Sequence, residues 1–303
     1  MKVSIIIPIY NGECYIQRCL ESLRQQTYHY WEAICVNDGS KDNSEKLLLK
    51  QSSTDSRIKV ISKNNEGVVK ARELGIKHAN GEYIMFLDID DTLTRDALQL
   101  LINKITEHPE ADIVVSGFNI VVNDKIKKVK KVNFDFLDPK SYLKRILTGK
   151  NGWELCAKMY KKSLFTNSLK LPIHLRVGED AAIFIQLVVH VKIIIGLKTP
   201  IYNYIQHSSS VSHTKSAELA QETLQAAFFI ENILQTTAYY HELRHYINAM
   251  FLLFYSNSTR RGHLKRSSQL LTKARKEHFS FTAFSKIPFH KALYILANYW
   301  LKE

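Results

Sequence analysis

Short apolar runs alternate with stretches of helical periodicity through the first 120 residues. The runs have the length of buried strands, and the segments between them repeat apolar residues at the spacing of one helix face. The expected strands are residues 3–7, 31–36, 58–62, 83–87 and 113–118, and the expected helices are residues 14–26, 44–51, 68–79 and 95–108, the last with Thr94 as its N-cap. This alternation predicts an α/β fold with a mainly parallel, Rossmann-like sheet and helices on both faces.

The pattern loosens after residue 120. Lysines crowd residues 125–131, which we expect to form an exposed hairpin or loop edge. The later expected elements are helices near 141–147 and 180–189 and strands near 156–160, 193–197 and 201–205; from about residue 215 the pattern is helical, broken by polar stretches near 256–262 and 279–288. We therefore predict a catalytic α/β domain over residues 1–212 and a helical, basic C-terminal region over residues 213–303.

Positive charge is concentrated in that C-terminal region. The chain carries a formal net charge of +13, and residues 241–303 hold eleven Lys or Arg against three acids, a net charge of +8, with aromatic residues among them. A basic, aromatic-rich helical segment can lie on an anionic membrane surface, and it can equally be a solvated basic face over an aromatic core. Nucleic acid is a weaker expectation, because no recognised binding motif accompanies the charge.

Other sequence features indicate a cytoplasmic protein. The four cysteines show no C-x-x-C spacing, which is typical of a reducing compartment. Met1 and Lys2 lead directly into the first strand, so we expect no signal peptide. The longest apolar stretch, residues 181–197, contains Gln186, His190 and Lys192, which favours a core helix followed by a strand over a membrane span.

Three carboxylates follow the apolar run at residues 83–87. Asp88, Asp90 and Asp91 come where a buried strand would leave the sheet. Carboxylates this close repel one another and favour a divalent cation between themselves and a phosphate. The cluster therefore predicts magnesium- or manganese-dependent handling of a phosphorylated substrate, and the simpler alternative is an acidic turn that caps the helix beginning near Thr94.

Three other polar segments also fall at expected strand ends. They are residues 8–12, 37–42 and 64–67. Taken singly, Asn37-Asp38-Gly39-Ser40 is an ordinary turn, and Tyr10 is more often a core or rim residue than a stacking one. Because the carboxyl ends of parallel strands meet at one edge, we expect these segments and the acid cluster to converge there.

In order and spacing, these segments resemble the motifs of family-two glycosyltransferases with the GT-A fold, of the bacterial surface-polysaccharide type. The matching segments are Ser4-Ile5-Ile6-Ile7-Pro8-Ile9-Tyr10-Asn11, Val36-Asn37-Asp38-Gly39-Ser40, Glu66-Gly67-Val68-Val69-Lys70-Ala71-Arg72 and residues 81–91. The motifs cover about residues 3–118, and weaker signals extend to about residue 212. The resemblance implies a nucleotide-sugar half at about 1–118 and an acceptor half at about 119–212.

The resemblance also implies inverting transfer from a nucleotide sugar, usually a UDP-sugar, with Mn²⁺ or Mg²⁺. Tyr10 would then stack near uracil, Asp38 would accept its N3–H, and Arg72 would lie near the nucleotide or its phosphates. Asp90 would contact the metal, and Asp88 would hold the ribose or the metal. The remaining expected donor-site residues are Pro8, Asn11, Gly67 and Ile89. One departure is Asn37, where the family often has a second aspartate.

The expected catalytic residues come later in the chain. Gly178-Glu179-Asp180 resembles the family's acidic pair, with Asp180 as the base that deprotonates the acceptor hydroxyl and Glu179 as support or acceptor binder. The alternative is that both acids merely favour a helix N-terminus. Trp153 would form the floor of the acceptor site, and Lys158 in the same segment would also bind the acceptor.

A weaker match covers residues 202–213, which resemble the loop that closes over the diphosphate. His207 would complete the metal shell or contact phosphate, with His213 as the second candidate. Family members often carry arginine nearby, and a lone loop histidine is usually only solvated.

Two other functions compete. Asp88 and Asp90 also fit the D-x-D-x-T motif of haloacid-dehalogenase-type phosphatases, although three strands precede the motif here and no later G-D-x-x-x-D segment appears. A non-catalytic nucleotide- or membrane-binding module is the third possibility, against which the intact acids argue. We predict a cytoplasmic glycosyltransferase, peripheral on the inner face of the membrane, that extends a lipid-linked surface glycan. The donor sugar, the acceptor, the linkage and the oligomeric state stay open.

Overall fold

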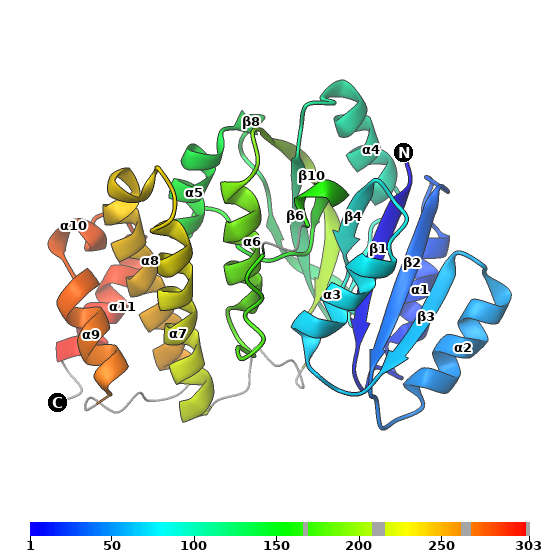
Figure 1. The fold of residues 1–303 in the computed structure, drawn as a ribbon, viewed down its shortest axis with the longest axis horizontal. Helices are drawn as coiled ribbons and strands as arrows, with labels where there is room; N and C mark the ends of the chain where they lie inside the picture. The colour runs from blue at the N-terminus through cyan, green and yellow to red at the C-terminus, as the bar shows by residue number, and fades with distance from the viewer. Residues whose placement is uncertain (166–168, 208–215, 262–267, 301–303) are drawn as a thin grey trace. The chain divides into compact units, whose positions relative to one another are not determined.

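The computed structural model describes residues 1–165, 169–207, 216–261 and 268–300 of the chain. Its contacts divide the chain into two compact units (Figure 1). The first comprises Met1–Asp138, Leu155–Leu171 and His190–His207, and the second comprises Pro139–Glu154, Pro172–Val189 and Ser208–Glu303. Both units draw on separate stretches of the chain, whereas we expected one division near residue 212. That functional division stays a prediction.

A ten-stranded mixed sheet forms the centre of the first unit. Its strands are β1 (Val3–Ile9), β2 (Trp31–Asp38), β3 (Ile58–Lys63), β4 (Tyr83–Phe86), β5 (Thr92–Leu93), β6 (Ile113–Val122), β7 (Lys125–Lys130), β8 (Phe136–Leu137), β9 (Lys158–Lys161) and β10 (Ile194–Ile205). Their order is β3-β2-β1-β4-β9-β6-β10-β5, with β7 paired to β6 and β8 paired to β10. The strands β1 to β4 are parallel, and β9 pairs antiparallel with both β4 and β6.

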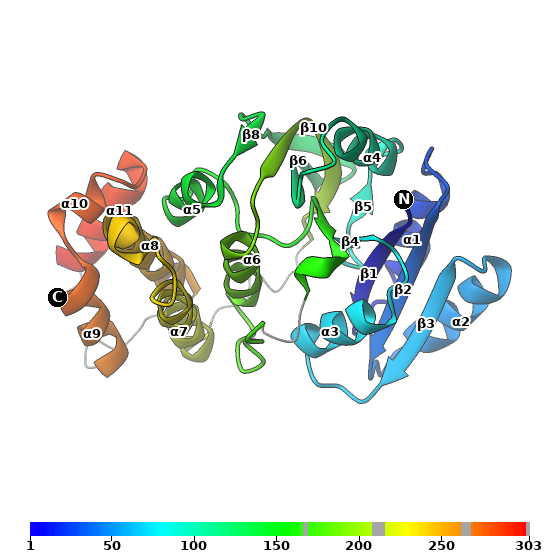
Figure 2. The ribbon, with the colours of Figure 1, turned by 45° about the horizontal axis from the view of Figure 1, so that its top comes forward.

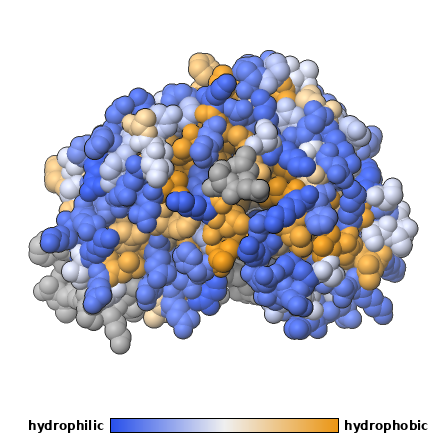
Figure 3. All heavy atoms as spheres, viewed as in Figure 1, coloured by the Kyte–Doolittle hydropathy of each residue, from blue (hydrophilic) through white to orange (hydrophobic). Residues whose placement is uncertain are grey.

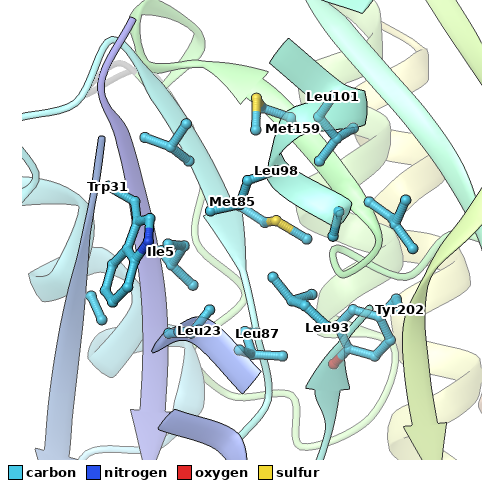
Figure 4. Packing of buried hydrophobic residues seen from close by; sticks show 14 of the residues in the cluster. Ile5, Leu23, Trp31, Met85, Leu87, Leu93, Leu98, Leu101, Met159 and Tyr202 are labelled. Atoms are coloured by element: carbon cyan, nitrogen blue, oxygen red, sulfur yellow. The ribbon is translucent and has the colours of Figure 1, made fainter. Parts of the chain in front are cut away.

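Helices lie on both faces of the sheet (Figures 1 and 2). They are α1 (Ile16–Arg24), α2 (Ser44–Thr54), α3 (Val68–His78) and α4 (Ala97–Glu107). Side chains alternate between the two faces of a strand. On β1, Ile5 and Ile7 therefore join an apolar core to which α1, α2 and α4 also contribute side chains. Figure 4 shows Ile5 in this core together with Leu23 of α1 and Leu98 of α4. Ile6 faces the other side, where a Cβ on Gly75 of α3 would come within 2.5 Å of its Cγ2. The predicted α/β architecture is confirmed.

The second unit is helical in the described residues. Its helices are α5 (Pro139–Leu147), α6 (Glu179–Val189), α7 (Ala217–Leu234), α8 (Tyr240–Arg261), α9 (Gln269–His278), α10 (Phe281–Phe284) and α11 (Phe289–Trp300). The helix α8 lies against α7, α9, α10 and α11. Its Phe251 stacks on the buried ring of His278, with 3.6 Å between ring centroids, and His278 Nε2 lies 3.2 Å from the buried Glu231 carboxylate. The prediction that the C-terminal region is helical is thus confirmed for the residues that the structure describes.

Several local expectations need correction. The two strands expected near 193–197 and 201–205 are one strand, β10, whose register against β6 shifts between Leu197 and Tyr202. Thr94 is not the N-cap of α4; Asp96 occupies that position without a side-chain cap. The short strands β5 and β8 were not expected, because two residues carry too little periodicity. The helix α8 continues through most of the polar stretch near 256–262 and ends within it, at Arg261. The lysine-rich hairpin is confirmed as β6–β7.

Surface composition is mixed. On the face drawn in Figure 3, hydrophilic residues dominate and apolar residues show between them. Among the side chains that the structure describes, the most exposed large apolar ones are Phe281 in α10 and Phe289 in α11, at 90% and 77%. Within the described ranges, we find no helix with both the length and the apolar character needed to cross a bilayer.

Candidate active site

The acid cluster lies at a point where the order of the sheet reverses. The strand order 3-2-1-4 places β1 between β2 and β4, and pairing of β1 with β4 ends at Ile6 and Phe86. Residues 87–91 leave the sheet there, beside the carboxyl end of β1. In open α/β sheets, ligands bind outside the carboxyl ends of the strands at such a reversal. Pro8 lies just past the last residue paired with β4, where its missing N–H is not needed for that pairing.

Arg72 connects α3 to the acid cluster. Its side chain is buried, and Nη2 donates to Asp88 Oδ1 at 3.1 Å. The guanidinium carbon also lies 5.9 Å from the centroid of the Phe86 ring, at the end of β4. A guanidinium is always charged, so it offsets the charge of Asp88 and directs that carboxylate.

Asp90 contacts His207, the second residue after β10. Its Oδ2 lies 2.9 Å from His207 Nε2, and its carbonyl oxygen accepts a hydrogen bond of 2.9 Å from Arg18 Nη2. The other ring nitrogen of His207 lies 3.4 Å from the Tyr15 hydroxyl, and the two rings stack with centroids 5.1 Å apart. Both Asp90 and His207 keep partial exposure, at 30% and 23% of their side chains.

Asp91 is buried and joins the acid loop to β10. Its Oδ2 accepts a hydrogen bond of 2.6 Å from the Tyr202 hydroxyl, and its Oδ1 accepts one of 2.7 Å from the Ile205 amide. The same hydroxyl accepts a hydrogen bond of 3.3 Å from the Asp88 amide. Burial, with the charges of Asp88 and Asp90, raises the pKa of Asp91 to about 8, although its two hydrogen bonds oppose the rise. Asp91 and Tyr202 therefore set the spacing between the acid loop and the segment that carries His207.

Asp38, the last residue of β2, is held by the loop before α3. Lys63 Nζ and the Glu66 amide donate to Oδ1 at 2.9 and 3.0 Å, and the Gly67 amide donates to Oδ2 at 2.8 Å. Gly67 has φ +89°, a conformation that glycine adopts without strain. A carboxylate oxygen has two lone pairs. These contacts occupy both acceptor directions of Oδ1 and one of Oδ2.

The loop after β1 bonds to the loop after β2. The Lys41 amide donates to Asn11 Oδ1 at 2.8 Å, and the Asn11 amide donates to Ser40 Oγ at 3.0 Å. Asn11 has φ +51°, which asparagine tolerates better than most residues. Its neighbour Tyr10 is about half exposed. Ile89, by contrast, packs against the apolar core. The four expected segments thus converge at one edge of the sheet.

The other expected site residues come from other segments of the chain. Glu179 and Asp180 are the first two residues of α6, in the second unit. Trp153 belongs to that unit and packs on Phe254, with ring centroids 4.7 Å apart. Lys158 is buried in β9 of the first unit, and its Nζ donates to the Cys156 carbonyl at 3.3 Å. His213 lies outside the described residues. The roles assigned to all five stay predictions.

Sequence reasoning missed two contacts at this site. Tyr202 was noted only as part of an expected strand and of the segment at residues 202–213, and Lys63 was not noted. The sequence does place Lys63 just after an expected parallel strand, and that position was the one available sign that it could reach Asp38. Nothing in a single sequence pairs Tyr202 with Asp91, because 111 residues separate them.

A model described as glycosyl transferase family 2 matches residues 4–169, more than half of the chain. The chain belongs to glycosyl transferase family 2. EpsH of Bacillus subtilis, named as a glycosyltransferase, is 33% identical over 241 residues, covering 76% of this chain and 70% of that protein. The family membership makes this chain a transferase enzyme and speaks against both the phosphatase and the non-catalytic module.

Two solved structures share the fold. Staphylococcus aureus TarS 1–349 in complex with UDP-GlcNAc superposes with a TM-score of 0.70 at 18% identity, covering 98% of this chain and 88% of that one. A mannosyltransferase from Pyrobaculum calidifontis in complex with GDP-Man and Mn²⁺ gives a TM-score of 0.55 at 16% identity, covering 99% and 88%. These likenesses confirm the GT-A architecture of the chain.

Proposed function

We propose that this glycosyltransferase moves a sugar, with inversion and with the help of a divalent metal, from a UDP-sugar to a hydroxyl of a growing surface glycan. The observation that carries the proposal is the convergence of Asp38, Arg72, Asp88 and Asp90 at the strand-order reversal. The family membership and the UDP-GlcNAc complex of TarS support a nucleotide-sugar donor.

Asp38 is the residue that would recognise the base. Its contacts leave one lone pair of Oδ2, so the carboxylate can accept one further N–H. Uracil offers such a donor at N3, whereas N3 of cytosine is an acceptor. The partly exposed ring of Tyr10, one residue before the loop that bonds to residues 40 and 41, would stack on the base. Pro8, Asn11 and Gly67 would shape this edge of the donor site.

The residues present fit a divalent metal that is shared with a diphosphate. Asp90 and His207 offer an oxygen and a nitrogen 2.9 Å apart, and Asp88 lies in the same loop. In the described part of the chain, no three His, Cys, Asp or Glu side chains gather closely enough to hold a metal alone. That donor set suits Mg²⁺ or Mn²⁺, which bind through one or two carboxylates together with substrate phosphates and water. When bound, the metal would offset charge on the departing diphosphate.

The chain's own residues would then perform the transfer. Arg72 holds Asp88 in place for the ribose or the metal. Asp180, at the start of α6, would take the proton of the acceptor hydroxyl as its oxygen attacks the anomeric carbon, and the bond from that carbon to the diphosphate would break on the opposite face. Glu179, Trp153 and Lys158 would bind the acceptor, which we propose to be a lipid-linked saccharide at the cytoplasmic face of an anionic membrane.

Donor binding gives the first test. UDP, other nucleoside diphosphates and their sugars are screened by thermal shift with and without Mn²⁺, and we expect UDP compounds with Mn²⁺ to raise the melting temperature most. Asp90→Asn should remove the Mn²⁺-dependent part of the shift. Asp124→Asn, in the exposed β6–β7 turn, is the matched control and should behave as the wild type.

Catalysis gives the second test. Asp180→Asn should keep the UDP shift and lower sugar transfer by about 10²-fold or more, the range that a positioned general base contributes. An unaltered transfer rate in Asp180→Asn would remove Asp180 from the role of base. A UDP shift that is the same with and without Mn²⁺ would remove the metal.

A further inference from the structure

The last helix of the chain presents an apolar face to solvent. Phe289, Leu293 and Leu296 of α11 are spaced at i, i+4 and i+7, so they lie on one side of the helix. Their exposed fractions are 77%, 50% and 39%. Ala292 and Ile295 of the same helix are buried. Ala292 and Ile295 thus face the second unit, while Phe289, Leu293 and Leu296 form a separate apolar side of α11 that is exposed to solvent.

The short helix α10 adds a further apolar side chain. Phe281, at its first position, is 90% exposed. The helices α9, α10 and α11 all pack on α8, so Phe281 and the exposed residues of α11 belong to helices that share one packing partner. We name Phe281, Phe289, Leu293 and Leu296 the α10–α11 surface. Exposed apolar groups of this kind mark interaction sites.

The charge around this surface decides between occupants. Residues 269–297 contain five Lys or Arg and a single acid, Glu277. Lys273, Lys276 and Lys286 are exposed. A second copy of the chain would bring the same positive charges against this end, and like charges across an interface disfavour association. An anionic lipid surface is complementary to both features, because its headgroups attract lysine and its acyl boundary takes up Phe and Leu.

We propose that the α10–α11 surface inserts into the headgroup region of a bilayer that contains anionic phospholipid. Phe289, Leu293 and Leu296 would enter the acyl boundary with α11 parallel to the membrane plane, and Phe281 would enter beside them. The inference rests on the proposed function in one respect, since a lipid-linked acceptor gives the contact its purpose.

The test uses the full chain and sedimenting vesicles of phosphatidylcholine, with or without phosphatidylglycerol. The wild type should bind only vesicles that contain phosphatidylglycerol. Phe289→Asn combined with Leu293→Asn should weaken binding by about tenfold or more, because the apolar part of the contact is lost. Leu49→Asn, an exposed apolar residue on α2 of the first unit, is the matched control and should leave binding unchanged.

The electrostatic part is tested separately. Lys273→Gln, Lys276→Gln and Lys286→Gln together should weaken binding to anionic vesicles and reduce its dependence on salt. Vesicle binding that is absent in the wild type, or equal in the Phe289/Leu293 variant, would overturn the proposal. A dimer in analytical ultracentrifugation that this variant converts to a monomer would overturn it too, in favour of a second copy. The UDP thermal shift, measured on the same proteins, should stay constant; its absence from all of them would refute the donor proposal and leave the vesicle result intact.

Discussion

Glu32, a buried glutamate in β2, should contribute measurably to the free energy of unfolding of the first unit. Glu32 Oε1 accepts hydrogen bonds of 2.6 Å from Ser4 Oγ and from the Asn80 amide. Its Oε2 accepts from Lys59 Nζ at 2.7 Å and from Lys2 Nζ at 2.9 Å. Burial alone would raise the pKa of Glu32, but these four donors outweigh it and lower the pKa from 4.5 to about 2. Glu32 therefore ties β2 to β1, to β3 and to the turn before β4.

The size of the effect follows from the shift. A pKa lowered from 4.5 to about 2 corresponds to about 3 kcal/mol at neutral pH. Lys59 and Lys2 keep 42% and 27% of their side chains exposed, so solvent screens both pairs and we expect about 2 kcal/mol. Because the folded-state pKa is the lower one, the stabilisation is complete above pH ~4.5 and is lost as the pH falls toward 2.

Glu32→Gln should lower the free energy of unfolding of the first unit by about 2 kcal/mol at pH 7, and by less than about half of that at pH 3. Hydrogen exchange of peptides from β1 and β2, read by mass spectrometry, reports opening of this unit. Glu82→Gln is the control, since the Glu82 side chain is 66% exposed. It should change the free energy by less than about 0.5 kcal/mol. A Glu32→Gln difference below that limit, or one that is equal at pH 7 and pH 3, would refute the reasoning.

Three further predictions concern the site and its support. Tyr202→Phe should lower the free energy of unfolding by about 1–2 kcal/mol in urea titrations, because it removes the hydroxyl that donates a hydrogen bond to Asp91. The control, Tyr83→Phe, should change the free energy of unfolding by less than about 0.5 kcal/mol. Gly75→Ala should lower the free energy of unfolding by about 1–3 kcal/mol, because the new methyl group would clash with the Ile6 side chain of β1. An unchanged melting temperature would contradict this prediction. His207→Asn should weaken Mn²⁺ binding in the presence of UDP by about tenfold or more in calorimetry, and equal affinity would exclude the imidazole as a ligand.

Much of the first unit could be predicted from the chain alone. The strands β1, β2 and β4 are mainly apolar runs that the sheet buries on both faces, and α1 and α4 carry an apolar stripe, so a window of ten or twenty residues predicts each of these elements. The meeting of the four polar segments could also be predicted, because parallel strands bring the loops at their carboxyl ends to one edge of the sheet. The convergence of Asp38 with Gly67, and of Arg72 with Asp88, follows from that topology.

Other features depended on contacts between distant residues. Pairing of β9 between β4 and β6, and the shift that makes β10 one strand, arise from sheet register, which short windows do not contain. The same holds for the partners of Glu32, which come from three separate segments of the chain. Local pattern determines which residues form a strand, a helix or a strand-end loop of this transferase. Only the folded chain decides which donor meets each buried carboxylate, because a charge removed from water is stable only beside the groups that tertiary packing brings to it.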